Sequence, residues 1–230
     1  MRRSLIDAGP LNLLPESLVL MPEERVIRTG EAACPFAALN AARFARNVLE
    51  ENVDDKLSTV QLRKVFKKLG LSKSLLQNPD SAFFRFMMST RDGRLYDLPK
   101  VLLAGILLSG GSLTEKAGIL FDHFDENANG QLESHELYQA FALVFDVSVN
   151  CTSTLGLGPD LSPEALSKYQ AGLNKHREEY IVDHVMIVTR GQKVVTKEIF
   201  LRAVTSHQLA SLTCANKVRE SVCRVYRNSS

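Results

Sequence analysis

The segment DENANGQLESHE, residues 125–136, places oxygen-bearing side chains at nearly every second position. Asp125 begins the segment and Glu136 ends it. Calcium prefers roughly six to eight oxygen ligands in a flexible geometry, and carboxylates and carbonyl groups supply them. Gly130 lies at the centre, where glycine allows a sharp reversal because it tolerates positive φ. The segment therefore predicts a calcium-binding loop.

The predicted ligands occupy alternating positions and the last position of this loop: Asp125, Asn127, Asn129, Gln131, Glu133 and Glu136. Gln131 needs to offer only its backbone carbonyl, and Glu133 binds directly or through a water molecule. Glu136 is long enough to reach back and clamp the ion with both carboxylate oxygens. This spacing resembles the loop of the EF-hand family at every diagnostic position. The resemblance implies one bound Ca²⁺.

Apolar residues flank the loop at helical spacing. Phe121 and Phe124 precede it, and Leu137 and Phe141 follow it on one helical face. Leu132, the eighth loop residue, has the position that forms a short β-bridge between paired EF-hands. These flanks predict a helix–loop–helix unit that packs against a second unit.

A second segment, residues 50–61, matches the same pattern in part. It begins with Glu50, but Asp55 stands at the glycine position and Gln61 at the last position. Glutamine cannot supply a charged bidentate clamp. We interpret the segment as a degenerate EF-hand loop, and weak calcium binding there stays open as an alternative.

Two further segments match less well. Residues 88–99 keep Asp92 and Gly93 but lack both terminal acids, and residues 187–198 end at Glu198 with few oxygen donors before it. An ordinary helical hairpin is the alternative for residues 187–198. In the four-hand interpretation, the predicted bridge pairs are Leu57 with Leu95, and Leu132 with Val194 or, equally, Val195.

The resemblance covers about residues 36–206 and is similar to the four-hand calcium sensors of the neuronal calcium sensor and calcineurin B groups. It implies an all-α fold of two EF-hand pairs with short loop β-bridges, in which three of the four helix–loop–helix units are degenerate. We expect these divisions: an irregular N-terminal arm at 1–35, one pair at 36–110, a second pair at 111–208 with an insertion at 147–178, and an amphipathic tail at 209–230. The Ser-, Thr- and Gly-rich residues 147–161 predict a linker, and Ser162-Pro163 predicts a helix start.

Composition excludes several classes of function. The 28 basic and 26 acidic residues leave a net charge of +2, which gives no reason to expect a nucleic-acid partner. The longest apolar run, residues 101–108, is too short to span a bilayer. The four cysteines form no C-x-x-C pair, so we expect a reducing compartment and a cytoplasmic location, free or attached to the cytoskeleton.

The residues point to a binding protein rather than an enzyme. No nucleophile elbow, phosphate-binding loop or zinc-ligand spacing occurs. The EF-hand resemblance implies a calcium-responsive adaptor or regulatory subunit that binds an amphipathic helix of a protein partner in an apolar groove. The alternative is a constitutive structural subunit of a cytoskeletal or ciliary assembly, in which calcium only stabilises one hand. The leucine-rich residues 11–20 and the amphipathic residues 209–226 are candidates to fill such a groove from within the chain.

Overall fold

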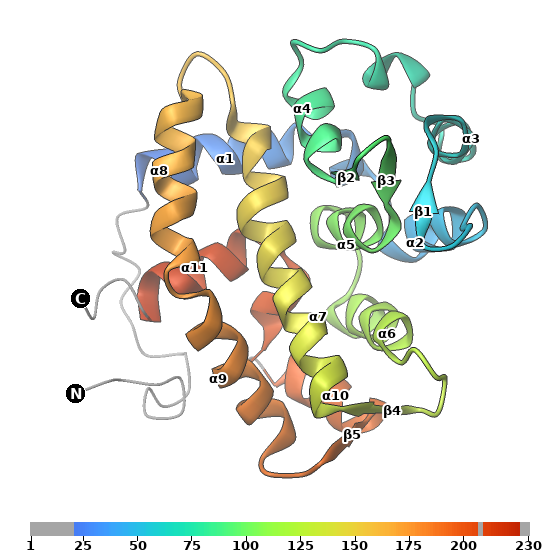
Figure 1. Cartoon of the computed structure of the whole chain (residues 1–230), viewed down its shortest axis with the longest axis vertical. Helices are drawn as coiled ribbons and strands as arrows, with labels where there is room; N and C mark the ends of the chain where they lie inside the picture. Colours follow the sequence, from blue (N-terminus) through green and yellow to red (C-terminus); the bar gives the residue numbers. More distant parts are fainter. Residues whose placement is uncertain (1–20, 207–208, 226–230) are drawn as a thin grey trace.

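The computed structural model describes residues 21–206 and 209–225, and helices dominate this part of the chain (Figure 1). The α-helices are α1 (Pro22–Ala32), α2 (Ala41–Leu49), α3 (Thr59–Leu69), α4 (Ala82–Ser89), α5 (Leu98–Leu108), α6 (Leu113–Phe124), α7 (Ser134–Asp146), α8 (Pro163–Asn174), α9 (Arg177–Thr189), α10 (Lys197–Thr205) and α11 (Ala215–Val225). The strands are β1 (Lys56–Leu57), β2 (Arg91–Asp92), β3 (Leu95–Asp97), β4 (Gln131–Glu133) and β5 (Val194–Thr196). Shorter helical turns are η1 (Pro35–Ala38), η2 (Lys73–Leu76), η3 (Val147–Cys151), η4 (Thr152–Gly156) and η5 (Ala210–Thr213). The predicted helical class is confirmed, with two small antiparallel sheets added to it.

Polar residues that accept a hydrogen bond from the third helical amide set the start of most central helices. These caps are Asn40, Ser58, Ser81, Asp97, Ser112, Ser162 and Thr196. The predicted start at Ser162-Pro163 is confirmed, because Ser162 Oγ accepts from the Ala165 amide and α8 begins at Pro163.

Four helix–strand–helix connections lie in two groups. β1 joins α2 to α3, and the β2–β3 hairpin joins α4 to α5; these strands form one sheet in the order β1-β3-β2. β4 joins α6 to α7 and pairs with β5, which joins α9 to α10. Figure 1 shows the first group at the upper right and the second at the bottom.

The strand registers correct one expectation and decide another. Leu57 faces Tyr96 and not Leu95, so the predicted Leu57–Leu95 pair is wrong by one residue. Tyr96 is buried whereas Leu95 is 40% exposed. Because a shift of one residue turns a strand over, burying the larger ring decides the register. In the second sheet Leu132 faces Val195, which is buried, and Val194 is 39% exposed.

The N-terminal arm is not irregular throughout, as the sequence predicted for residues 1–35. Residues 22–32 form α1, which packs against η4 and buries Ile27. A Cβ atom added at Gly30 would lie 2.1 Å from the Leu155 carbonyl oxygen, so glycine permits this close approach. α1 also buries Glu24 and Glu31, which do not look like core residues in a sequence. Residues 11–20 lie outside the described residues.

The prediction of a linker at 147–161 is also wrong for most of that stretch. α7 continues into η3 and η4, and Ser148, Thr152 and Ser153 are fully buried there. Thr152 Oγ1 donates to the Ser148 carbonyl at 3.0 Å, so a hydroxyl group is satisfied by its own helix. Such back-bonding lets a Ser- and Thr-rich stretch enter the core.

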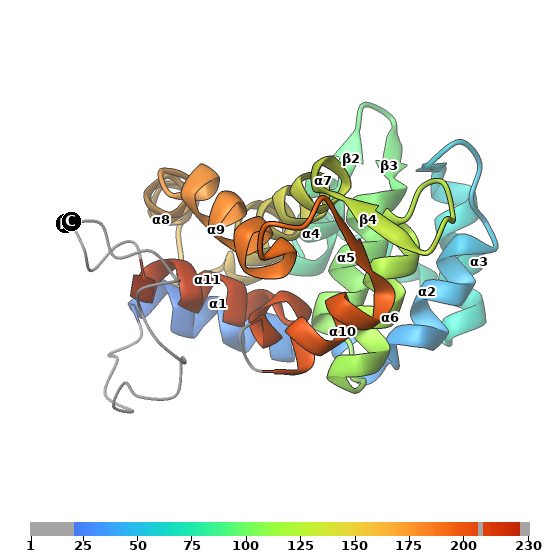
Figure 2. The ribbon, with the colours of Figure 1, turned by 90° about the horizontal axis from the view of Figure 1, so that it is seen from below.

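A buried ion network joins the two ends of the described chain. Arg219 of α11 is fully buried and donates to Glu24 Oε2 at 2.9 Å, Glu24 Oε1 at 3.1 Å and Glu31 Oε1 at 2.8 Å. It also donates to the Ser148 carbonyl and Thr152 Oγ1, and the Tyr169 hydroxyl donates to Glu24 at 2.6 Å. Figure 2 shows α11 alongside α1. The network therefore ties α1, α8, α11 and the 147–156 stretch into one core.

The interior of each helix group is filled by a segment outside that group. Phe36 of η1 lies among four rings, with ring centroids 4.8–6.1 Å from those of Phe44, Phe66, Phe83 and Phe86. η5 packs against α5, α6 and α10 and is flanked by the buried Leu209. In the described part of the chain, no helix has the length and apolar character needed to cross a membrane.

Candidate metal-binding loop

Five of the six residues predicted to bind calcium lie in the connection between α6 and α7, and the sixth, Glu136, lies in the first turn of α7. α6 ends at Phe124, β4 covers Gln131–Glu133, and α7 begins at Ser134. Figure 1 shows this connection as the loop at the lower right, held at β4 by the pairing with β5. The two helices and the strand pair thus fix both ends of the loop.

Backbone amides hold the side-chain oxygens of the first half of the loop. The two carboxylate oxygens of Asp125 accept from the Asn129 amide at 3.0 Å and the Gly130 amide at 2.8 Å. Asn127 Oδ1 accepts from the Asn129 amide at 3.0 Å, and Asn129 Oδ1 accepts from the Gln131 amide at 2.8 Å. A carboxylate or amide oxygen can accept further bonds, so these oxygens stay able to ligate a cation. These hydrogen bonds fix the positions of the side-chain oxygens.

The backbone at the centre of the loop needs the residues found there. Gly130 has φ of 76°, in the left-handed region, and no atom lies within 4 Å of a Cβ added to it. Glycine is therefore favoured for its backbone conformation and not for lack of space. Ala128 also has positive φ, 53°, which is costly for alanine and marks a constrained turn.

Glu136 lies at the end of the loop in the first turn of α7. Its Oε2 accepts from the Glu133 amide at 2.8 Å, and the residue is only 3% exposed. The Glu133 side chain is more open, with an oxygen 3.4 Å from His135 Nδ1. A buried carboxylate held by one oxygen at a helix N-terminus retains a second oxygen for another partner.

The donor set suits a hard cation. Among the described residues, no group of three or more His, Cys, Asp or Glu side chains is assembled to hold a metal ion. Three of the six predicted ligands, Asp125, Glu133 and Glu136, are acids, and the other three offer amide or backbone oxygens. Calcium accepts such oxygens, whereas zinc and copper favour cysteine and histidine ligands. The residues present fit calcium.

The third residue of each helix that follows a strand distinguishes the four connections. Glu136 has this position in α7. The equivalent residues are Gln61 in α3, Lys100 in α5 and Ile199 in α10, each of which donates its amide to the helix cap. Only the α6–α7 connection therefore has an acid at the position predicted for the bidentate calcium ligand. The sequence pattern put Pro99 and Glu198 at this position, but the strands pair through Tyr96 and Val195, one residue later than Leu95 and Val194, so Lys100 and Ile199 take it instead.

Lysine and glutamine side chains bind the polar groups of the connection between α2 and α3. Gln61 Nε2 donates to the Glu51 carbonyl at 2.9 Å, and its Oε1 accepts from the Ser58 amide at 2.8 Å. Lys68 Nζ lies 3.1 Å from Glu50 and 2.9 Å from Glu51. The Lys68 ammonium group thus already pairs with Glu50, the first residue of this loop, and the Gln61 amide with the Glu51 carbonyl.

Acidic residues of the other two connections, α4–α5 and α9–α10, also pair with basic side chains. Lys56 Nζ, from β1, lies 2.9 Å from Asp92 and 3.7 Å from Asp97 of the neighbouring hairpin. Glu198 pairs with Arg202 on its own helix at 2.6 Å. The sequence analysis did not predict the ion pairs of Lys56 and Lys68, because their acidic partners lie outside the helical spacing of three or four residues. The only signal in the sequence was a lysine close to each of these degenerate loops.

No family model matches this chain, and no curated protein matches its sequence.

Proposed function

We propose that this protein binds one Ca²⁺ at residues 125–136 through an EF-hand loop and acts as a calcium-responsive adaptor or regulatory subunit. The observation that carries the proposal is the acid at the third position of α7, which the three other connections lack. Within the described residues, no ion pair joins Asp125 or Glu136 to a lysine or arginine, whereas Glu50, Asp92 and Glu198 each have such a partner. The 125–136 loop thus keeps its charge for an ion.

The helix arrangement supports a four-hand organisation. In this proposal α2–α3 and α4–α5 are one EF-hand pair, and α6–α7 and α9–α10 are the other, each joined through its short sheet. Three of the hands persist as packing units whose loops no longer need an ion. The insertion between α7 and α9 supplies η3, η4 and α8 to the core.

The proposed partner is an amphipathic helix of another protein, bound in an apolar groove of this chain. Calcium can change the exposure of such a groove by moving α6 relative to α7, since both helices adjoin the ion's ligands. A cytoplasmic location, free or on the cytoskeleton, belongs to the same proposal.

One observation favours the alternative of a constitutive structural subunit. Phe36 and the η5 segment already fill the interiors of the two helix groups, and the Lys116 ammonium holds η5 by donating to the Thr213 carbonyl at 3.1 Å. A permanently filled interior leaves calcium only a stabilising role.

A fluorescent dye that binds exposed apolar surface separates the two candidates. We expect its emission to rise when Ca²⁺ is added to the chelator-treated protein and to return when chelator is added again. Mg²⁺ at the same concentration is the control, because it demands a tighter octahedral site. Equal emission with and without Ca²⁺, in a protein shown to bind the ion, would favour the structural subunit.

A further inference from the structure

An open cleft of about 1190 Å³ lies between the two helix groups, beside the candidate metal-binding loop. Its apolar walls come from α2, α6 and α7: Ala42, Ala45, Leu49, Ile119, Phe124 and Leu143. Leu49 is 44% exposed, so a large side chain faces solvent there. Clefts for small molecules measure roughly 300–1,000 Å³, and this one exceeds that range. Its size and apolar walls suit a row of side chains from another polypeptide.

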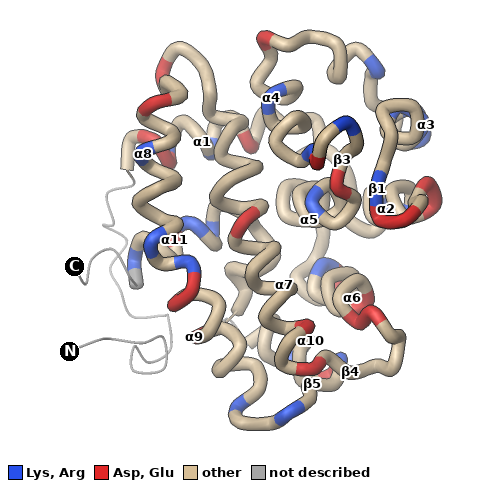
Figure 3. Tube along the Cα trace, viewed as in Figure 1, with Lys and Arg blue, Asp and Glu red and all other residues tan. Residues whose placement is uncertain are grey.

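The rim of the cleft is acidic. Its charged residues are Arg46, Glu50, Asp55, Asp122, Asp125 and Glu126. Lys68 pairs with Glu50 and Lys197 pairs with Asp122. In the described chain, no ion pair joins Asp55, Asp125 or Glu126 to a basic residue. Figure 3 shows acidic positions after α2 and at the end of α6, two of the helices that line the cleft.

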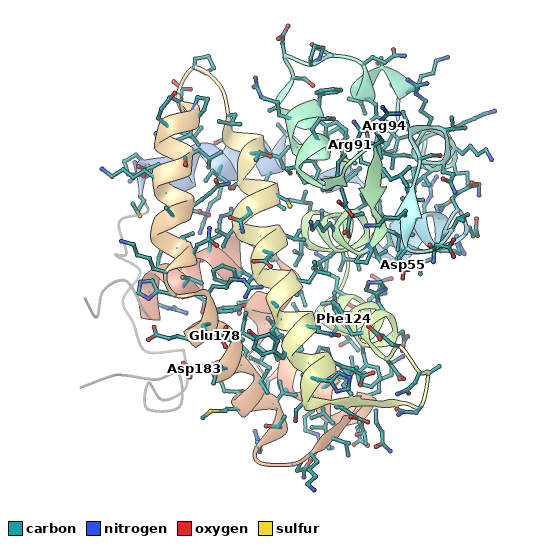
Figure 4. The ribbon with its side chains drawn as sticks, viewed as in Figure 1. Asp55, Arg91, Arg94, Phe124, Glu178 and Asp183 are labelled. Carbon is teal, nitrogen blue, oxygen red and sulfur yellow. The ribbon has the colours of Figure 1, made fainter. Side chains whose placement is uncertain are left out.

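The sides of the cleft come from different parts of the chain. Figure 4 shows Asp55 at the edge of the β1 connection that faces α6, and Phe124 between α6 and α7. His123 also lines the cleft.

We propose that this cleft binds a basic amphipathic helix from a partner protein. The inference rests on the proposed function and names the surface and the chemistry of the partner. Leucine-like residues at helical spacing would contact Leu49, Phe124 and Leu143, as in other helix-in-groove complexes. Lysine or arginine residues on the edges of that helix would face Asp55 and Glu126, which favours basic over acidic partners.

The position of the cleft links the partner to the loop. Asp125 is a predicted calcium ligand and also lines the cleft, and Glu126 follows it. This surface differs from the interiors of the helix groups, which Phe36 and η5 fill. A partner can therefore bind here without displacing the chain's own segments.

Binding of a synthetic helical peptide tests the proposal. The probe has leucines at helical spacing and lysines elsewhere, and its counterpart has glutamates in place of the lysines. We expect fluorescence anisotropy to show binding of the lysine peptide, with affinity that falls as salt rises, and at least tenfold weaker binding of the glutamate peptide. Equal binding of both peptides, or of neither, would overturn the proposal.

Variants locate the peptide on the protein. Leu49→Ser should weaken binding about tenfold through loss of an apolar anchor, and the double variant Asp55→Asn/Glu126→Gln should weaken it and flatten its salt dependence. Val60→Ser and Asp80→Asn, at exposed positions outside the cleft, are the matched controls and should bind like the parent. Unchanged peptide binding by both cleft variants would contradict the assignment. So would a dimer of the protein that Leu49→Ser converts to monomers, because a second copy of the chain would then occupy the cleft.

Calcium titration of the same samples keeps this test separate from the proposed function. We expect Leu49→Ser to bind Ca²⁺ like the parent protein, because Leu49 contributes no loop oxygen. If Leu49→Ser loses peptide binding but still binds Ca²⁺, the change affects only the cleft. Absence of calcium binding in the parent protein would instead contradict the proposed function.

Discussion

Replacing Glu136 by glutamine should abolish high-affinity calcium binding while the helices remain. Glutamine keeps the length of the side chain but removes the charge of the bidentate clamp. Gln61 already shows that glutamine fits this position, because it accepts from the Ser58 amide as Glu136 accepts from the Glu133 amide. We expect the dissociation constant to rise from the sensor range, about 10⁻⁷ to 10⁻⁵ M, to roughly 10⁻³ M or weaker.

Isothermal titration calorimetry measures this change, and circular dichroism checks that the helices are intact. Glu198→Gln is the matched control, since Glu198 is an acid near the start of α10 but pairs with Arg202. It should leave calcium affinity unchanged. If Glu136→Gln binds calcium as tightly as the parent protein, the assigned register of the loop is wrong.

Removing Arg219 should produce the largest loss of stability. Arg219→Ala leaves Glu24 and Glu31, both buried, without their main cationic partner. Breaking a buried ion pair from one side costs about 3–5 kcal/mol, because the remaining charge stays desolvated. Urea denaturation followed by circular dichroism measures the free energy of unfolding. Arg202→Ala, which breaks an exposed pair with Glu198, should change it by about 0.5 kcal/mol or less.

The effect of Arg219→Ala should depend on pH. Burial alone would raise the pKa of Glu24, but the charge of Arg219 and hydrogen bonds from Arg219, Tyr169 and Arg28 lower it below the usual 4.5. A carboxyl group with a lowered folded pKa stabilises the protein above its unfolded pKa and loses that contribution as pH falls through the folded value. The difference in the free energy of unfolding between the parent protein and Arg219→Ala should therefore become smaller below about pH 4.5. A neutral-pH loss under 1 kcal/mol would contradict the role of this network.

Local features of the chain were predictable from the sequence. Each ligand position of the 125–136 loop lies within twelve consecutive residues, so spacing alone could identify it. The helices on both sides of it follow from apolar residues at helical intervals, and the start of α8 follows from Ser162-Pro163. These signals need no knowledge of distant contacts.

Features that depend on distant partners were not predictable. The sequence of α1 was interpreted as part of an irregular arm, whereas Arg219, some 190 residues away, pairs with Glu24 and Glu31 in the core. The 147–156 stretch reads as a linker until its hydroxyls bond to their own helix turns. The bridge register depended on which of two adjacent residues, such as Leu95 and Tyr96, was buried. In each case tertiary packing decided between local alternatives.

Calorimetric titration of the full chain with Ca²⁺ after treatment with chelator tests the central claim most directly. We expect one ion per chain, bound with a dissociation constant of about 10⁻⁷ to 10⁻⁵ M, because only the 125–136 loop has acids at both its first and last positions. Lys56, Lys68 and Ile199 stand against binding at the other three connections. No binding in that range, or two or more sites of similar strength, would contradict a single functional EF-hand.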